Sequence, residues 1–115
     1  MDQVAGYQHT ELAEGRWIQM SIAEQMGNIG SEISRSLRWY NKNPKRFQAS
    51  FDRALELIDL SINAAQAQSQ TAYLKELCRA REELCDYFDG NDWGTDPRQM
   101  QKYYDQFISL VRPTV

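Results

Sequence analysis

Apolar residues in this chain recur at steps of three and four positions, which is the spacing of a helix face and not of a strand. The first such stripe consists of Ile18, Ile22, Met26, Ile29, Ile33, Leu37 and Tyr40. Thr10 can act as an N-cap before this stripe, and basic residues gather near its end, where the helix dipole favours cations. The pattern therefore predicts one long helix over about residues 10–41.

Three further helices follow, and prolines and glycines mark their ends. Pro44 disfavours a helical residue before it and suits the first turn of a second helix, over about residues 44–66. Gly90 is expected to end a third helix at about residues 71–89, and Pro97 to begin a fourth at about residues 97–111. No segment alternates like a strand. We therefore predict an all-α fold, an antiparallel four-helix bundle with a long first helix, formed by residues 1–115 as a single domain.

Size and charge exclude several classes of protein. The 115 residues carry 13 Lys/Arg and 16 Asp/Glu, a formal charge of −3, so no global positive potential can hold a nucleic acid. The chain contains no apolar run long enough to span a membrane, and residues 1–15 lack the basic start and apolar core of an export signal. We expect a cytoplasmic protein with no membrane partner.

The cysteine and histidine content predicts no metal site. Cys78 and Cys85 lie seven residues apart on one predicted helix, too far for a disulfide, and we expect reduced, buried thiols. Together with His9 they lack the short cysteine spacing of a zinc site. Because His9 is the single histidine, the Glu-x-x-His pairs of a di-iron bundle are also missing.

The net charge of −3 conceals a basic segment. Between Ile33 and Arg53 the sequence holds six cations and one acid, so this segment is +5 and the rest of the chain is −8. The candidate anion-binding residues are Arg35, Arg38, Lys45, Arg46 and Arg53. Aromatic residues lie among them, which favours a corner that binds a phosphate or a nucleic-acid backbone. The alternatives are a solvated corner and a contact with the acidic third helix of a second copy.

Two pairs of acids have the spacing that places both carboxylates on one helix face. They are Glu56 with Asp59 and Glu83 with Asp86. The pattern resembles the ExxE…ExxD arrangement of the MazG-like all-α nucleotide pyrophosphatases, although Asp59 stands where that family more often has Glu. This resemblance implies a Mg²⁺ site formed by the four carboxylates, used for nucleoside triphosphate hydrolysis. The alternative is that these acids form salt bridges with neighbouring arginines.

A charged residue also interrupts the apolar stripe of the third predicted helix. A charge at a helix seam costs desolvation unless it is paired, so we expect Arg81 to meet Asp59, Glu56 or Glu32 across the bundle. Glu32, Asp59 and Arg81 are therefore the predicted structural polar core. Such a pair would set the register of the helices, or else line a pocket.

Four segments carry a broader resemblance: residues 28–35, 51–60, 74–88 and 101–107. Together they resemble a group of small prokaryotic all-α proteins to which we attach no activity. The size and helical layout are also similar to HEPN-type bundles, which partner minimal nucleotidyltransferases or cleave RNA. The ribonuclease members place His four to six residues after an Arg, and residues 83–88 of this chain contain none. This resemblance therefore implies a partner or nucleotide-binding role.

We expect a non-catalytic protein-interaction or oligomerisation module. A first helix of roughly 46 Å would extend beyond the third and fourth helices, and a second copy or another protein subunit would cover the excess. The alternatives are a Mg²⁺-dependent nucleotide pyrophosphohydrolase and a nucleotide- or RNA-binding HEPN-like subunit. The sequence favours a protein that is not an enzyme. We expect no cofactor, except Mg²⁺ if the protein is the hydrolase of the first alternative.

Overall fold

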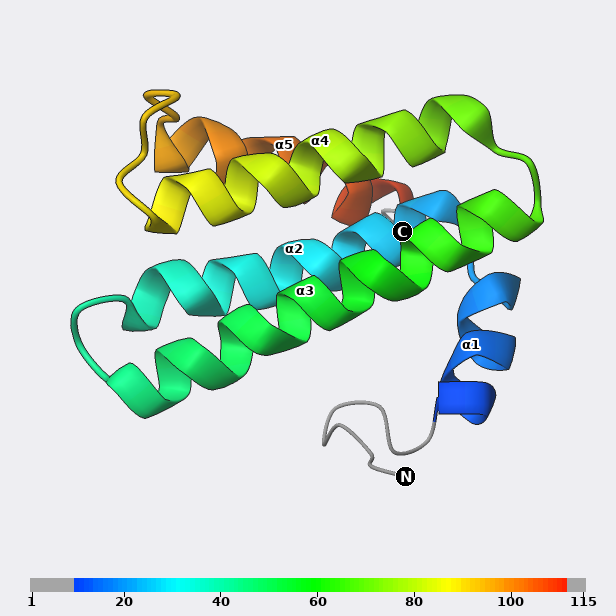
Figure 1. Ribbon diagram of the computed structural model, residues 1–115, viewed down its shortest axis with the longest axis horizontal. Helices are drawn as coiled ribbons and strands as arrows, with labels where there is room; N and C mark the ends of the chain where they lie inside the picture. Colours follow the sequence, from blue (N-terminus) through cyan, green and yellow to red (C-terminus); the bar gives the residue numbers. More distant parts are fainter. Residues whose placement is uncertain (1–9, 112–115) are drawn as a thin grey trace.

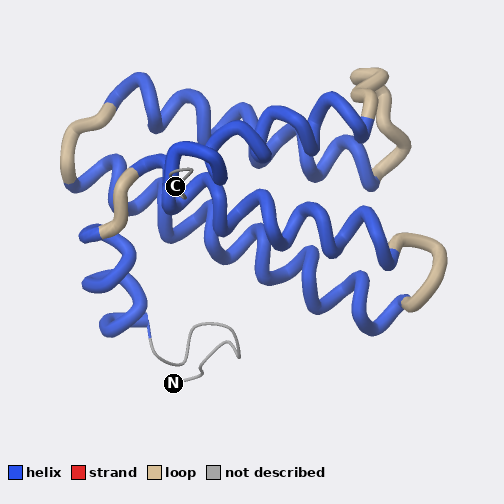
Figure 2. Tube along the Cα trace, turned by 180° about the vertical axis from the view of Figure 1, so that it is seen from behind, coloured by secondary structure: helices blue, strands red, loops and turns tan. Residues whose placement is uncertain are grey.

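The computed structural model describes residues 10–111, and over this range the chain is helical with no strand. The helices are α1 (Thr10–Gln19), α2 (Ile22–Trp39), α3 (Pro44–Ala67), α4 (Thr71–Phe88) and α5 (Pro97–Val111). α2 and α3 lie side by side, α5 packs on α2, and α4 packs on α3, while α1 projects at an angle and packs against α3 (Figures 1 and 2). The predicted all-α class is confirmed. None of the helices described in residues 10–111 is long and apolar enough to cross a membrane.

The single long first helix is wrong, because the chain breaks into α1 and α2 at Met20 and Ser21. Ser21 is the N-cap of α2 in a capping box with Glu24. The Glu24 amide donates to Ser21 Oγ at 3.0 Å, and the Ser21 amide donates to Glu24 Oε1 at 2.8 Å. This reciprocal pair satisfies amides that a new helix start leaves without partners. The overhang that predicted a second copy along a long helix is therefore not present.

The break also changes which residues are buried. Ile18 and Ile22, expected in the core stripe, are each 38% exposed, whereas Trp17 is 7% exposed. Because the chain turns between these two isoleucines, the apolar stripe of α1 is no longer continuous with that of α2. In the rest of the stripe, Met26, Ile29 and Ile33 are buried as predicted and Leu37 is partly buried, whereas Tyr40 is 40% exposed.

Buried polar side chains connect α1 to the bundle. Trp17 Nε1 donates to Ser61 Oγ at 2.7 Å, and Gln25 Nε2 donates to the Trp17 carbonyl oxygen at 2.8 Å. The Tyr73 hydroxyl donates to Gln25 Oε1 at 2.8 Å. Burial raises the pKa of Tyr73 to about 12, which keeps this hydroxyl protonated as a donor. These hydrogen bonds join α1, α2, α3 and α4. Because a buried polar group without a hydrogen bond is destabilising, the network favours this arrangement of the four helices.

The other helix ends lie within two residues of the predicted positions. Asn43 is the N-cap of α3, its Oδ1 accepting from the Arg46 amide at 3.1 Å, and Pro44 occupies the first helical position. Gly90 follows α4 with φ +94°, a conformation that glycine adopts without strain. Local residue chemistry is sufficient to place these ends.

Gly30 lets α2 and α5 approach closely. A Cβ atom at this position would lie 2.5 Å from Tyr104 Cβ, whereas one at Gly27 would meet Ile108 Cγ1 at an ordinary 3.7 Å. Tyr104 is 1% exposed and packs into the common core. The fully buried centre of that core contains Ile29, Ile33, Ala54, Ile58, Ala65, Leu77 and Leu84.

Candidate functional site

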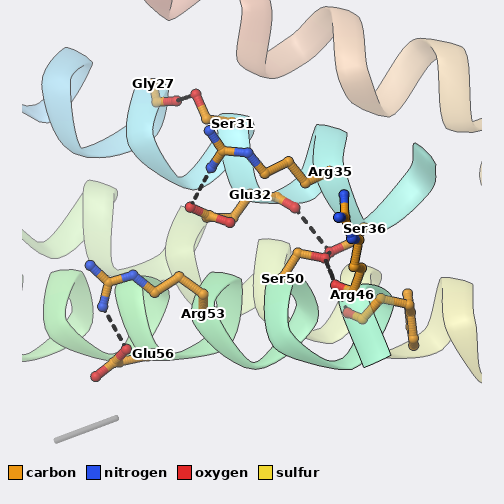
Figure 3. A network of polar contacts seen from close by, with 10 residues as sticks. Gly27, Ser31, Glu32, Arg35, Ser36, Arg46, Ser50, Arg53 and Glu56 are labelled. Atoms are coloured by element: carbon orange, nitrogen blue, oxygen red, sulfur yellow. Dashed lines mark hydrogen bonds and ion pairs between the residues drawn. The ribbon is translucent and has the colours of Figure 1, made fainter. Parts of the chain in front are cut away.

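A groove between α2 and α3 brings together three of the five predicted anion-binding residues. Its volume is about 410 Å³. The lining residues are Glu32, Arg35, Trp39, Arg46, Ala49, Ser50 and Arg53, and we call this site the arginine groove. Figure 3 shows its three arginines together with Glu32 and Ser50. Since the two helices run antiparallel, residues far apart in the sequence meet along it. Arg38 and Lys45 are exposed near the same corner but are not among the lining residues.

Two buried serines form the contact beneath the groove. The Ser36 and Ser50 hydroxyl oxygens lie 3.3 Å apart. Each also lies 2.9 Å from a carbonyl oxygen one turn earlier, that of Glu32 for Ser36 and that of Arg46 for Ser50. Small side chains with satisfied hydroxyls allow α2 and α3 to pack closely here while the longer arginine side chains remain at the rim.

Each arginine of the groove is held by a neighbour. Arg35 Nη1 lies 2.7 Å from Glu32 Oε2. The Arg46 guanidinium lies over the Trp39 ring, 4.8 Å from its centroid, in a cation–π contact.

The third arginine has a carboxylate partner on its own helix. Arg53 Nη1 lies 2.7 Å from Glu56 Oε1. The side chains of Arg35 and Arg53 are 55% and 53% exposed. Because a guanidinium has five N–H donors, one ion pair leaves capacity to bind a further anion.

The basic surface continues from the groove towards α1. Arg53 also lines a neighbouring cavity of about 240 Å³ with Arg16, Trp17 and Asn28. Arg16 was not predicted as an anion-binding residue, because it is 19 positions before Arg35 and outside the basic segment. The folding of α1 against α3 is what places it here.

The predicted partner of Arg81 is correct, but the predicted polar core is not. Arg81 Nε donates to Asp59 Oδ1 at 2.9 Å, which joins α4 to α3. Their side chains are 41% and 36% exposed, so the pair lies at the bundle surface. Glu32 instead pairs with Arg35 on its own helix. The Arg81–Asp59 pair is therefore suited to fixing the register of α3 and α4 without a large desolvation cost.

The four carboxylates of the predicted Mg²⁺ site have separate partners. In residues 10–111, no three His, Cys, Asp or Glu side chains gather in a group that could hold a metal ion. Glu56 pairs with Arg53, Asp59 with Arg81, Glu83 with Arg79 and the Thr95 hydroxyl, and Asp86 with the Trp93 amide. The salt-bridge interpretation accounts for the ion pairs of Glu56, Asp59 and Glu83, and we do not propose the hydrolase.

The cysteines differ from the expectation of buried thiols. Both are free, but Cys78 is exposed and Cys85 is partly buried. α4 packs on the core through Leu77 and Leu84, and this orientation leaves Cys78 outside. His9, the remaining residue of the rejected zinc set, lies outside the described residues.

A second polar cluster connects α4 to α5. The Tyr103 hydroxyl donates to Glu76 Oε2 at 2.5 Å, and Arg79 Nη2 lies 2.8 Å from the same oxygen. The hydrogen bonds from Arg79 and Tyr103 lower the pKa of Glu76, while burial and the bond to Glu76 raise the pKa of Tyr103. All of these groups have mutual partners, so the cluster serves packing between the two helices.

No family model matches the chain, and no curated protein or solved structure matches it at a significant level. The resemblances to small prokaryotic all-α proteins, to HEPN-type bundles and to MazG-like enzymes therefore stay predictions.

Proposed function

We propose that the protein is a non-catalytic interaction module that binds an acidic segment of a partner protein in the arginine groove. The observation that carries this proposal is the convergence of Arg35, Arg46 and Arg53 from two helices on one groove of about 410 Å³. Exposed guanidinium groups bind carboxylates through paired, charge-assisted hydrogen bonds. The volume is in the range of sites that hold several side chains or a small ligand.

The acids of the groove favour a polypeptide over a nucleic acid. Glu32 lines the groove, and Glu56 is bound to Arg53 at its edge. These carboxylates would repel the closely spaced phosphates of a nucleic-acid backbone, whereas a protein segment can place individual acids next to the arginines. The formal charge of −3 on the whole chain acts in the same direction.

A nucleotide or a short single-stranded RNA is the second candidate ligand. The specific observation in its favour is Trp39 in the groove beside Arg46, because aromatic rings next to arginines form the platforms on which bases stack. Such binding would fall steeply with salt.

The test is fluorescence anisotropy with the full chain and two labelled probes of equal charge, an oligoglutamate peptide and oligouridylate. We expect the peptide to bind more tightly, and Arg46→Glu to weaken its binding at least about tenfold. This variant should fold normally, since a glutamate in the first turn of α3 is favoured by the helix dipole.

Arg98→Glu is the matched control. Arg98 is 93% exposed on α5 and outside the groove, so its reversal makes the same charge change and should alter binding less than about twofold. Equal losses in the two variants would show a non-specific charge effect and contradict the proposal. Tighter binding of the oligouridylate probe than of the peptide would instead support the second candidate ligand, a nucleotide or a short single-stranded RNA.

A further inference from the structure

The connection between α4 and α5, residues 89–96, presents an exposed aromatic residue among acids. Trp93 is 53% exposed. Asp89, Asp92 and Asp96 are exposed around it. Exposure of the large apolar surface of a tryptophan to water is unfavourable. Tryptophan is also enriched among the residues that contribute most of the binding energy in protein interfaces. We call residues 89–96 the tryptophan loop.

Internal hydrogen bonds hold the tryptophan loop in shape. Asn91 Oδ1 accepts from the Thr95 amide at 2.8 Å, and Asn91 Nδ2 donates to the Thr95 carbonyl oxygen at 3.0 Å. The Trp93 amide donates to Asp86 Oδ2 at 3.0 Å, which fixes the loop to the end of α4. A loop that is already ordered loses little conformational entropy when it binds.

The arginine groove is complementary to this loop in charge and lies at the same end of the molecule. Trp39 ends α2 and Arg46 is in the first turn of α3, so the groove extends to the α2–α3 connection. That connection and the tryptophan loop are at one end of the bundle in both overall views (Figures 1 and 2). Two copies related by a twofold axis at this end could exchange both contacts, and such an interface closes as a dimer.

We infer that the acidic segment bound by the arginine groove is the tryptophan loop of a second copy of this chain. The inference rests on the proposed function and names its partner. In the dimer, the acids of one loop meet Arg35, Arg46 and Arg53 of the other copy, and Trp93 is removed from water. Each copy supplies one groove and one loop, so the dimer contains two equivalent contacts.

Sedimentation velocity over a range of protein concentrations tests the inference. We expect the wild-type chain to form a reversible dimer, and Trp93→Ala and Arg46→Glu each to weaken it at least about tenfold. Asp92→Lys is a second loop variant that keeps the tryptophan, and circular dichroism checks that each variant folds. Lys75→Glu, at an exposed position near the start of α4 and far along that helix from the tryptophan loop, makes the same charge change and should leave the dimer within about threefold of wild type.

Mixing two variants is the decisive measurement. Arg46→Glu retains an intact loop and Trp93→Ala retains an intact groove, so an equimolar mixture restores one of the two contacts. The mixture should associate more tightly than either variant alone and more weakly than wild type. A mixture that associates no better than its components would show that the two surfaces are not partners.

A wild-type chain that stays monomeric at every concentration would also overturn the inference. Oligoglutamate binding then separates the two proposals. If the peptide still binds and Arg46→Glu abolishes that binding, the groove binds acidic segments but its partner is another protein. If the peptide fails to bind as well, both the proposed function and the inference fail.

Discussion

The two sides of α2 hold their neighbours in different ways. Towards α5, Gly30 leaves space for Tyr104, and a single added Cβ would lie 2.5 Å from the tyrosine Cβ. Towards α3, the buried contact between Ser36 and Ser50 is bordered by an open groove of about 410 Å³ with arginines at its rim. The α5 side is tightly packed at Gly30 and Tyr104, although a cavity of about 340 Å³ lies beside Gly27 and Ile108. The α3 side keeps charged groups within reach of solvent.

This difference separates stability from binding within one helix. Tight apolar contacts stabilise the folded state because they exclude water. Since they are closely packed, an added methyl group is destabilising. Exposed ion pairs contribute little to folding, since water screens them, and they are therefore free to exchange partners. Changes on the α5 side should act on the free energy of unfolding, and changes on the α3 side should act on ligand binding.

The largest effect is expected from Gly30→Ala. The new methyl group would collide with Tyr104 Cβ, an atom next to the backbone, so α2 and α5 must move apart. We expect a loss of roughly 2 kcal/mol in the free energy of unfolding, the overpacking cost less the gain in helix propensity. Urea unfolding followed by circular dichroism measures it, and peptide binding by the folded protein should be unchanged.

Gly15→Ala is the matched control for this substitution. Gly15 is in α1, and a Cβ there would meet nothing within 4 Å. The same change should stabilise the protein by up to about 1 kcal/mol through helix propensity. If Gly30→Ala is as stable as Gly15→Ala, the close contact between α2 and α5 is not important for folding.

A smaller effect is expected at alkaline pH. Burial raises the pKa of Tyr73 to about 12, and burial also raises the pKa of Tyr103 and Tyr104 above the usual value near 10. A raised folded-state pKa gives stability that is complete below the unfolded-state pKa and is lost as the pH rises through the folded-state pKa. The free energy of unfolding should therefore fall above pH 10, by roughly 1 kcal/mol at pH 11 from Tyr73 alone.

Thermal unfolding between pH 8 and pH 11 measures this loss, and Tyr73→Phe should reduce the slope. The three tyrosines lie on α4 and α5, whereas the proposed binding residues of the groove are arginines, which stay charged over this range. Peptide affinity of the folded protein should therefore change less than its stability. A stability that is constant up to pH 11 would contradict the prediction.

The smallest effect on stability is expected from Glu32→Gln. This change breaks an ion pair with Arg35, whose side chain is 55% exposed, and should cost less than about 1 kcal/mol. It also removes a repulsive charge from the groove and releases a guanidinium, so affinity for oligoglutamate should rise about threefold. Glu82→Gln, at an exposed position on α4, makes the same chemical change and should alter neither quantity. An unchanged or lower affinity in Glu32→Gln would show that Arg35 does not bind the peptide.

The helix ends show what local sequence can predict. Pro44, Gly90 and Pro97 place their boundaries within a residue or so, because each acts through its own backbone conformation. The break at Ser21 was missed although Ser21 and Glu24 form a capping box, because the apolar spacing runs through it without interruption. The turn between α1 and α2 allows Trp17 to be buried against Ser61. These two residues are 44 positions apart, so local sequence does not reveal the contact.

Candidate sites were harder to predict than helix ends. The fold brings Arg35, Arg46 and Arg53 of the basic segment to one groove, leaves Arg38 and Lys45 out of its lining, and places Arg16 nearby. The paired acids have the spacing of a shared helix face, yet they bind separate partners. Spacing fixes which residues share a face of one helix, but not how that helix is rotated against the next.

The sequence by itself determined that this chain is helical, where three of its helices begin and end, and that its positive charge is concentrated in residues 33–53. These properties follow from backbone preferences and composition, which act over a few residues. Only the tertiary structure decided that α1 turns away from α2, and that Arg35, Arg46 and Arg53 share one groove. Both depend on how helices dock, since packing between distant residues sets the rotation of each helix and with it the direction of every side chain.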